Sequence, residues 1–290
     1  LDLKADTVEL NGTITGDVAG NEELLDGTRI SSTATTVEVE QGANIAQGLD
    51  IVLENGAVNV GDGEFDGGIV VDKTVTITGT GYTNTSTINV AAGSFGYNVI
   101  ANGVTIDGFA FKSVVEGSGV GIQVNGADNV TLSNNGFTKL QDGVRLTDSN
   151  NAKISGSLFT NNSDDGVEVT NSNNAEIVEN TFDMADTGDF GVDVTGTSDN
   201  VEIKANSFKG GASRSGVKLA GTGTATITEN TFDETRDGVF VSSSATYTTV
   251  NATGNSFTNI EDDAVDNNQA GLIVNASGNW WGTVVEADVL

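Results

Sequence analysis

The chain has 290 residues, a formal net charge of −29 from 41 acidic and 12 basic side chains, and no Cys, His or Pro. The charge disfavours nucleic acid and anionic membranes as partners, because both are themselves negative. The missing residue types exclude disulfides, metal sites built on Cys or His, and any mechanism that needs a thiolate or an imidazole.

The N-terminal part of the chain predicts an edge strand and then a short helix. Thr7-Val8-Glu9-Leu10 alternates polar and apolar residues, as a strand at the edge of a sheet does, and it could pair at the cap or with another subunit. From Ala43 to Glu54 apolar residues recur at helical spacing, and Asn55-Gly56 favours a helix end. We expect this helix to cap a fold whose apolar end is otherwise open.

The first regular repeats are expected from residue 57, and through the C-terminal half of the chain an Asn-x-Phe mark returns every 22 to 26 residues. A short strand with polar and apolar alternation precedes each mark, and a Gly-Val-x-Val/Leu strand lies further upstream. A period of about 24 residues matches one turn of a three-sided parallel β-helix. The marks are Asn135-Gly136-Phe137, the degenerate Ser157-Leu158-Phe159, Asn180-Thr181-Phe182, Asn206-Ser207-Phe208, Asn230-Thr231-Phe232, Asn255-Ser256-Phe257 and Asn279-Trp280-Trp281.

Stacked turns bring equivalent residues of successive repeats about 4.8 Å apart. We therefore expect the Phe residues to stack inside, and Asn129, Asn151, Asn174 and Asn200 to form an asparagine ladder at one corner. The absence of Pro agrees with this fold, because a strand paired on both sides needs every backbone N–H. The predicted organisation is an N-terminal strand and cap segment (1–42), a capping helix (43–56), a parallel β-helix (57–282) and a C-terminal tail (283–290).

The pattern resembles the pectate-lyase-like right-handed β-helix superfamily over residues 35–285. The cap helix, Gly61-Asp62-Gly63-Glu64-Phe65, the run from Lys73 to Gly79 and the serial Asn-x-Phe marks carry this resemblance. The closing Gly278-Asn279-Trp280-Trp281-Gly282 resembles the end of the repeat array in secreted and cell-surface members. The resemblance implies the fold and leaves the function open, because the superfamily includes lyases, hydrolases, epimerases, phage spikes and surface proteins.

Enzymes of that superfamily act on polysaccharides with the outward side chains of one strand ladder. In a lyase, Arg145 would be the base, and Glu168 and Asp193 would hold calcium. The alternative is a solvated face on which Arg145 pairs with Glu168, and Asp193 with Lys218. The corresponding ladder in this chain is Gln123, Arg145, Glu168, Asp193, Lys218 and Phe240.

Two Asp-Asp pairs, Asp164-Asp165 and Asp262-Asp263, are candidates for carboxylate-catalysed hydrolysis or for calcium binding. The Asn-Thr-Asp, Gly-His-Gly and Arg-Ile-Lys motifs of the related polygalacturonases are missing, as is the Asp-Pro-His-Glu motif of alginate epimerases. Each pair stands directly before an upstream strand, where Asp142 and Asp237 also precede Gly, and this position favours turn residues. No EF-hand loop or glycine-rich nonapeptide accompanies them.

Other candidate sites are aromatic residues and glycosylation acceptors. Phe240 and Trp280 are candidates for stacking on a sugar, with local packing as the alternative. Asn251 and Asn275 stand in Asn-x-Ser/Thr sequences on outward strand positions of successive turns, where a glycan could be attached.

The sequence favours an extracellular, non-catalytic structural or adhesive protein, such as a surface-layer, sheath, filament or adhesin module. Copies are expected to associate into a lattice or filament, or with other cell-surface proteins. Two alternatives remain: a calcium-dependent polysaccharide lyase or another polysaccharide-active enzyme, and a glycan-binding rod such as a phage receptor-binding protein. Calcium is the one cofactor to test, and no run of apolar residues is long enough to predict a membrane span.

Overall fold

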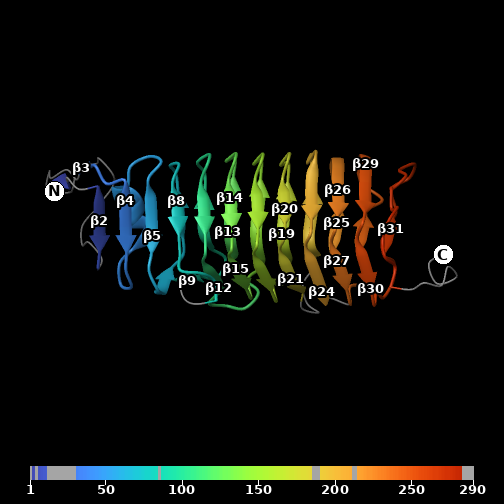
Figure 1. Ribbon diagram of the computed structural model, residues 1–290, viewed down its shortest axis with the longest axis horizontal. Coiled ribbons are helices and arrows are strands. Elements are labelled where there is room, and N and C mark those ends of the chain that lie inside the picture. The colour runs from blue at the N-terminus through green and yellow to red at the C-terminus, as the bar shows by residue number, and fades with distance from the viewer. Residues whose placement is uncertain are drawn as a thin grey trace.

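A computed structural model describes residues 2–3, 6–11, 31–83, 86–184, 190–210 and 214–282 of the chain. Every strand pairing between these residues is parallel, and the chain winds into one elongated solenoid with the strands across its long axis (Figure 1). Three sheets form its sides, so the predicted parallel β-helix is confirmed. Outside them, β1 (Asp2–Leu3) pairs with β3 (Ser31–Ser32) as a separate two-stranded sheet.

From β5 onward each turn of the solenoid contributes one strand to each side, and β2 and β4 extend the long sheet alone. The long sheet contains, in spatial order, β2 (Thr7–Leu10), β4 (Thr36–Val39), β5 (Ala57–Val60), β8 (Thr76–Thr78), β11 (Thr105–Asp107), β14 (Thr131–Ser133), β17 (Lys153–Ser155), β20 (Glu176–Val178), β23 (Val201–Lys204), β26 (Thr222–Thr228) and β29 (Thr246–Thr253). The phenylalanine sheet contains β6 (Gly63–Asp66), β9 (Ser86–Val90), β12 (Ala110–Ser113), β15 (Gly136–Thr138), β18 (Leu158–Thr160), β21 (Thr181–Met184), β24 (Ser207–Gly210), β27 (Thr231–Asp233) and β30 (Ser256–Thr258). The glycine sheet contains β7 (Ile69–Val71), β10 (Phe95–Val99), β13 (Val120–Asn125), β16 (Asp142–Thr147), β19 (Asp165–Thr170), β22 (Phe190–Thr195), β25 (Val217–Leu219), β28 (Val239–Val241) and β31 (Val265–Asn267).

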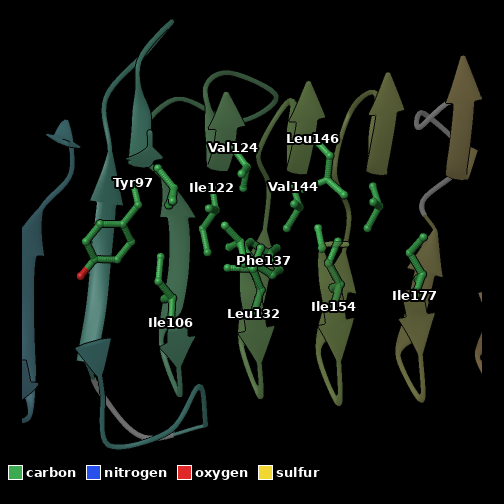
Figure 2. Close-up of a cluster of buried hydrophobic side chains, with 14 of the residues drawn as sticks. Tyr97, Ile106, Ile122, Val124, Leu132, Phe137, Val144, Leu146, Ile154 and Ile177 are labelled. Carbon is green, nitrogen blue, oxygen red and sulfur yellow. The ribbon is translucent and has the colours of Figure 1, made fainter. Parts of the chain in front are cut away.

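The inward side chains of the three sheets fill the solenoid with apolar ladders. In the long sheet, for example, Ile106, Leu132 and Ile154 occupy the same register in successive strands and have no exposed surface (Figure 2). The predicted phenylalanine stack is confirmed. From Phe111 to Phe257, the ring centroids of neighbouring turns lie 4.7 to 5.1 Å apart, and Trp281 continues the stack at 5.3 Å.

The recurrence of a Gly residue beside the phenylalanine stack has a steric cause. In seven successive turns, from Gly96 to Gly238, a Gly at or just before the start of the glycine-sheet strand packs against a ring of the phenylalanine stack. A Cβ added at Gly191 would lie 2.6 Å from Cδ1 of Phe208, and one at Gly166 would lie 2.6 Å from Cδ1 of Phe182. These are closer than real Cβ contacts, so any larger residue would push the ring or the strand aside.

Two asparagine ladders run from turn to turn along two corners of the solenoid. On the surface, the side-chain amides of Asn151, Asn174 and Asn200 each donate to the Asn Oδ1 of the preceding turn, at 2.9 to 3.2 Å, as predicted for the ladder that starts at Asn129. These residues have positive φ, which Asn tolerates well. The second ladder is buried and is formed by the Asn of the Asn-x-Phe marks.

The N-terminal end is capped by α1 (Ile45–Ile51), which contacts β4, β5 and β7. The helix is shorter than the predicted span from Ala43 to Glu54. It begins at Ile45 because Asn44 is its N-cap, accepting a hydrogen bond from the Ala46 N–H at 2.8 Å. It ends at Ile51 because the N–H of Leu53 donates instead to Ala34 O, at 2.9 Å, as the chain returns to the long sheet.

The long sheet extends beyond the helix at the N-terminal end. β4 pairs in register with β5, and β2 pairs in register with β4, so strand pairing continuous with the solenoid runs through part of the predicted segment 1–42. The predicted edge strand over Thr7-Val8-Glu9-Leu10 is β2, the outermost strand of this sheet (Figure 1). The predicted tail 283–290 lies outside the described residues. Among those described, no helix is long and apolar enough to cross a membrane.

Candidate functional site

The outward ladder of the glycine sheet brings the predicted residues into register. Arg145 lies beside Glu168, Glu168 beside Asp193, and Asp193 beside Lys218. The Arg145 Nε donates to Glu168 Oε2 at 2.7 Å, and the Lys218 Nζ donates to Asp193 Oδ2 at 2.8 Å. The two ion pairs expected for a solvated face are therefore present, and they occupy the only base and both carboxylates of the hypothetical lyase site.

A buried carboxyl group lies behind this ladder. Asp142, at the start of β16, has 1% exposed surface, and the Arg145 Nη2 donates to its Oδ2. The backbone N–H of Asp165 donates to the other oxygen, Oδ1, at 3.1 Å. Arg145 thus bridges Asp142 and Glu168. Burial raises the pKa of Asp142 to about 6, despite the opposing charge of Arg145.

Asp142, Asp164 and Asp165 form a group that we call the carboxyl trio, in which one oxygen from each residue lies within 4.8 Å of the others. Asp165 is 6% exposed, and its Oδ1 is buried with no hydrogen-bond partner among the described residues. Asp164 is half-buried and accepts a 3.4 Å hydrogen bond from Gln141. A small crevice of about 20 Å³ beside the trio is lined by Asp164 and by residues that include Phe159 and Phe190.

The electrostatic environment of Asp165 is unfavourable for an ionised carboxylate. Burial, and after it the negative charges of Asp193, Asp164, Asp142 and Glu168, raise its pKa to about 9. In the absence of metal, Asp165 therefore holds a proton at neutral pH. The pKa of Asp193 is raised as well, because burial raises it more than the neighbouring Lys218 lowers it.

This raised pKa predicts how stability depends on pH. Between the ordinary carboxyl value of 3.8 and about 9, folded Asp165 binds a proton that the unfolded chain has released, so its contribution to stability falls as pH rises through this window. The limiting slope for one proton is about 1.4 kcal/mol per pH unit. We expect urea unfolding in a chelator to show lower stability at pH 8 than at pH 6, and Asp165→Asn to remove much of this slope. An equal effect of Asp263→Asn, at an exposed carboxylate, would assign the slope to general charge repulsion instead.

The second predicted Asp pair also meets a carboxylate from the preceding turn. Asp262 and Asp263 lie near Asp237, with one oxygen from each within 4.8 Å of the others, and we call this group the second acidic trio. Here the buried Asp237 accepts a 2.8 Å hydrogen bond from the Ser215 hydroxyl, and Asp262 and Asp263 are exposed. The Arg236 Nη2 lies 3.3 Å from Asp262 Oδ2.

Sequence reasoning named two residues of each trio and missed the third as part of a site. Asp142 and Asp237 were recognised only as turn residues before Gly. The available signal was the register: Asp142 and Asp165 both precede a Gly-Val strand, in consecutive turns. The role of the buried Asn ladder was missed as well, although the Asn of each repeat mark was visible.

The remaining predicted residues lie on the surface or at the C-terminal end. Phe240 is half-buried, between Lys218 and Asp266 in the ladder, and Trp280 is 48% exposed. The side-chain amide of Asn275 donates to Asn251 Oδ1 at 3.3 Å on an outward position, so glycosylation at these two residues stays a prediction.

Solved structures with a similar fold include enzymes and a viral protein. An alginate lyase from Paenibacillus sp. str. FPU-7 aligns with a TM-score of 0.59 and 14% identity over 83% of this chain and 99% of that one. A hyperthermoactive exopolygalacturonase from Thermotoga maritima gives a TM-score of 0.52 and 10% identity, over 83% and 72% of the two chains. ORF18 of Geobacillus virus E2 gives 0.50 and 13%, over 81% and 56%. At these identities the likeness shows the fold alone.

At the level of sequence, no characterised protein matches the chain. Residues 120–286 do match a family described as a right handed beta helix region. This range spans more than half of the 290 residues and contains the Asn-x-Phe repeats and both trios. The protein therefore belongs to the right-handed β-helix family.

Proposed function

We propose that this protein is a non-catalytic extracellular rod with a structural or adhesive role at a cell surface. The observation that carries the proposal is that the charged side chains of the outward ladder form ion pairs with one another. Arg145 is held by Asp142 and Glu168, and Asp193 is held by Lys218, so the groups that a lyase would aim at a substrate already have partners in the fold. The buried carboxyl groups of Asp142 and Asp165 likewise present little surface to a polymer.

The ladders make such a rod stiff. Bending it would open backbone hydrogen bonds in three sheets at once and would separate the stacked rings of the phenylalanine sheet. In a solenoid each turn contacts only its neighbours, so the length of the rod follows from the number of turns without loss of local order. The strongly negative charge of the chain, −29, keeps such an extended β surface soluble.

Both ends of the rod support association of copies end to end. β2 is the outermost strand of the long sheet at the N-terminal end, and at the C-terminal end the last strand position of the same sheet is taken by Asn275, which pairs with Asn251. A wide hollow at this end is lined by apolar side chains such as Leu272 and Trp281 and by polar ones that include Asp262 and Asp263. Parallel addition of one copy's first strand to another's last would continue the long sheet past the capping helix as a heterologous, non-closing contact, which generates a filament.

A proline in β2 tests this contact. The carbonyls of Asp6 and Leu10 accept hydrogen bonds from Thr36 and Glu40, both at 3.0 Å, on the side of β4. Because successive residues of a parallel strand direct their backbone groups to opposite sides, the N–H of Glu9 points away from β4. We expect Glu9→Pro to abolish concentration-dependent association in sedimentation velocity, and Glu9→Ala, which keeps that N–H, to leave it unchanged. Equal association of both variants would contradict assembly through this edge.

Polysaccharide cleavage at the carboxyl trio is a second candidate function. One observation favours it: the carboxyl groups of Asp142, Asp164 and Asp165 lie together. The raised pKa of Asp165 would make it a proton donor beside a carboxylate, which is what glycosidic hydrolysis requires. Incubation with alginate, pectate and α-glucans, with and without calcium, tests both cleavage chemistries. New reducing ends that disappear in Asp164→Asn would establish hydrolysis there, and new unsaturated ends that disappear in Arg145→Lys would establish the lyase. Silence across the panel supports the non-catalytic rod.

A further inference from the structure

The carboxyl trio contains residues from two consecutive turns of the solenoid, which lie together at one corner. Asp142 begins β16, Asp165 begins the neighbouring β19, and Asp164 directly precedes Asp165. Three carboxylate oxygens, one from each residue, lie within 4.8 Å of one another. Two oxygens bound to the same Ca²⁺ ion, at about 2.3–2.6 Å each, lie at most about 5 Å apart, so this spacing suits one shared ion.

The buried oxygen of Asp165 lacks any donor. This residue is 6% exposed, and its Oδ1 has no hydrogen-bond partner among the described residues, whereas most buried polar atoms do have one. Arg145 does not supply the missing donor, because its hydrogen bonds go to Asp142 and Glu168. A metal cation bound by several oxygens would compensate the charge of this carboxylate, which then would not need a proton.

The second acidic trio provides an internal comparison at the equivalent position of later turns. Its buried member, Asp237, accepts a hydrogen bond from the Ser215 hydroxyl, just as Asp142 accepts one from Arg145. Its outer members, Asp262 and Asp263, are exposed to water, and Asp262 also meets Arg236. The two trios share their carboxylates and their spacing, and they differ in the buried oxygen without a donor.

We propose that the carboxyl trio of Asp142, Asp164 and Asp165 binds one Ca²⁺ ion, and that the second acidic trio does not. Each Asp contributes one carboxylate oxygen, and water fills the remaining positions. The ion connects two successive turns, so its binding stabilises the solenoid against unfolding. Ca²⁺ fits better than Mg²⁺, because Mg²⁺ requires oxygens at about 2.0–2.1 Å in near-octahedral geometry. This site is independent of the proposed assembly at the ends of the rod.

Calorimetric titration of the full chain with CaCl₂, after removal of metal with a chelator, tests the proposal. We expect one Ca²⁺ per chain, weaker binding of Mg²⁺, and a Ca²⁺-dependent rise in the unfolding temperature. Asp165→Asn should weaken Ca²⁺ binding on the order of tenfold or more, because affinity follows the charge of the ligands. Asp263→Asn, the matched change in the second acidic trio, should leave the affinity unchanged.

Folding of the variants is checked in the chelator by circular dichroism and thermal unfolding. Asp165→Asn should be at least as stable there as the parent, because it replaces a buried acid among other carboxyl groups with a neutral amide of nearly the same size. If it fails to fold, Asp164→Asn at the half-buried member gives the same expected loss of Ca²⁺ affinity. No heat of binding, full affinity in Asp165→Asn, or an equal loss in Asp263→Asn would each overturn the proposal.

Discussion

Replacement of Asn206 by alanine is expected to lower the free energy of unfolding by about 2–6 kcal/mol, because it leaves two buried backbone groups unpaired at about 1–3 kcal/mol each. The Asn206 Oδ1 accepts a hydrogen bond from the N–H of Asn180 at 2.8 Å, and its Nδ2 donates to Ile177 O at 2.8 Å. Both interactions cross from one turn to the preceding one. Urea unfolding followed by circular dichroism measures the loss.

The chain contains the control for this prediction. At the equivalent position of an earlier turn stands Ser157, whose hydroxyl oxygen accepts a hydrogen bond from the N–H of Asn135 at 3.2 Å. Asn206→Ser should therefore keep an acceptor for the N–H of Asn180 and lose less stability than Asn206→Ala. If the two variants are equally unstable, the ladder hydrogen bonds do not explain the repeated Asn.

Replacement of Phe208 by alanine should cost about 3–5 kcal/mol, the usual range for deleting a buried Phe side chain. Its ring is fully buried, and its centroid lies 4.7 Å from that of Phe182 and 4.8 Å from that of Phe232. Neighbouring turns are tied by three sheets and have little freedom to collapse into the cavity, so we expect a value in the upper part of the range. The measurement is again urea unfolding.

Two further variants serve as controls for this prediction. Phe208→Leu keeps much of the apolar volume and should lose less stability than Phe208→Ala. Trp280→Ala removes an even larger aromatic side chain, but one that is 48% exposed, and should change stability by no more than about 0.5 kcal/mol. Similar losses at Phe208 and Trp280 would mean that the stack contributes little beyond general apolar content.

The fold could be predicted from the sequence because the same local pattern occurs in turn after turn. A single Asn-x-Phe mark is weak evidence, but seven marks at 22 to 26 residues fix the period, the parallel pairing and the inward position of Phe. The helix was located from its apolar spacing, whereas its ends depended on other parts of the chain. Leu53 leaves the helix because Ala34, which is distant in sequence, accepts its N–H.

The candidate site could be predicted only in part, because its geometry depends on the corners between strands. Pairing of Arg145 with Glu168 follows from register alone and was expected. The convergence of Asp142 with Asp165 requires in addition that both corner residues turn their carboxyl groups to the same side, which no periodicity specifies. The missing donor for Asp165 Oδ1 depends on side chains from several turns and has no sequence signal.

Electron cryo-microscopy of the purified protein at increasing concentration tests the central proposal, a rod that assembles end to end, most directly. We expect unbranched filaments whose strands lie across the filament axis, with a repeat of about 4.8 Å that continues through the junctions between copies. Separate rods at every protein and salt concentration, together with cleavage of a polysaccharide in the activity panel, would contradict this proposal.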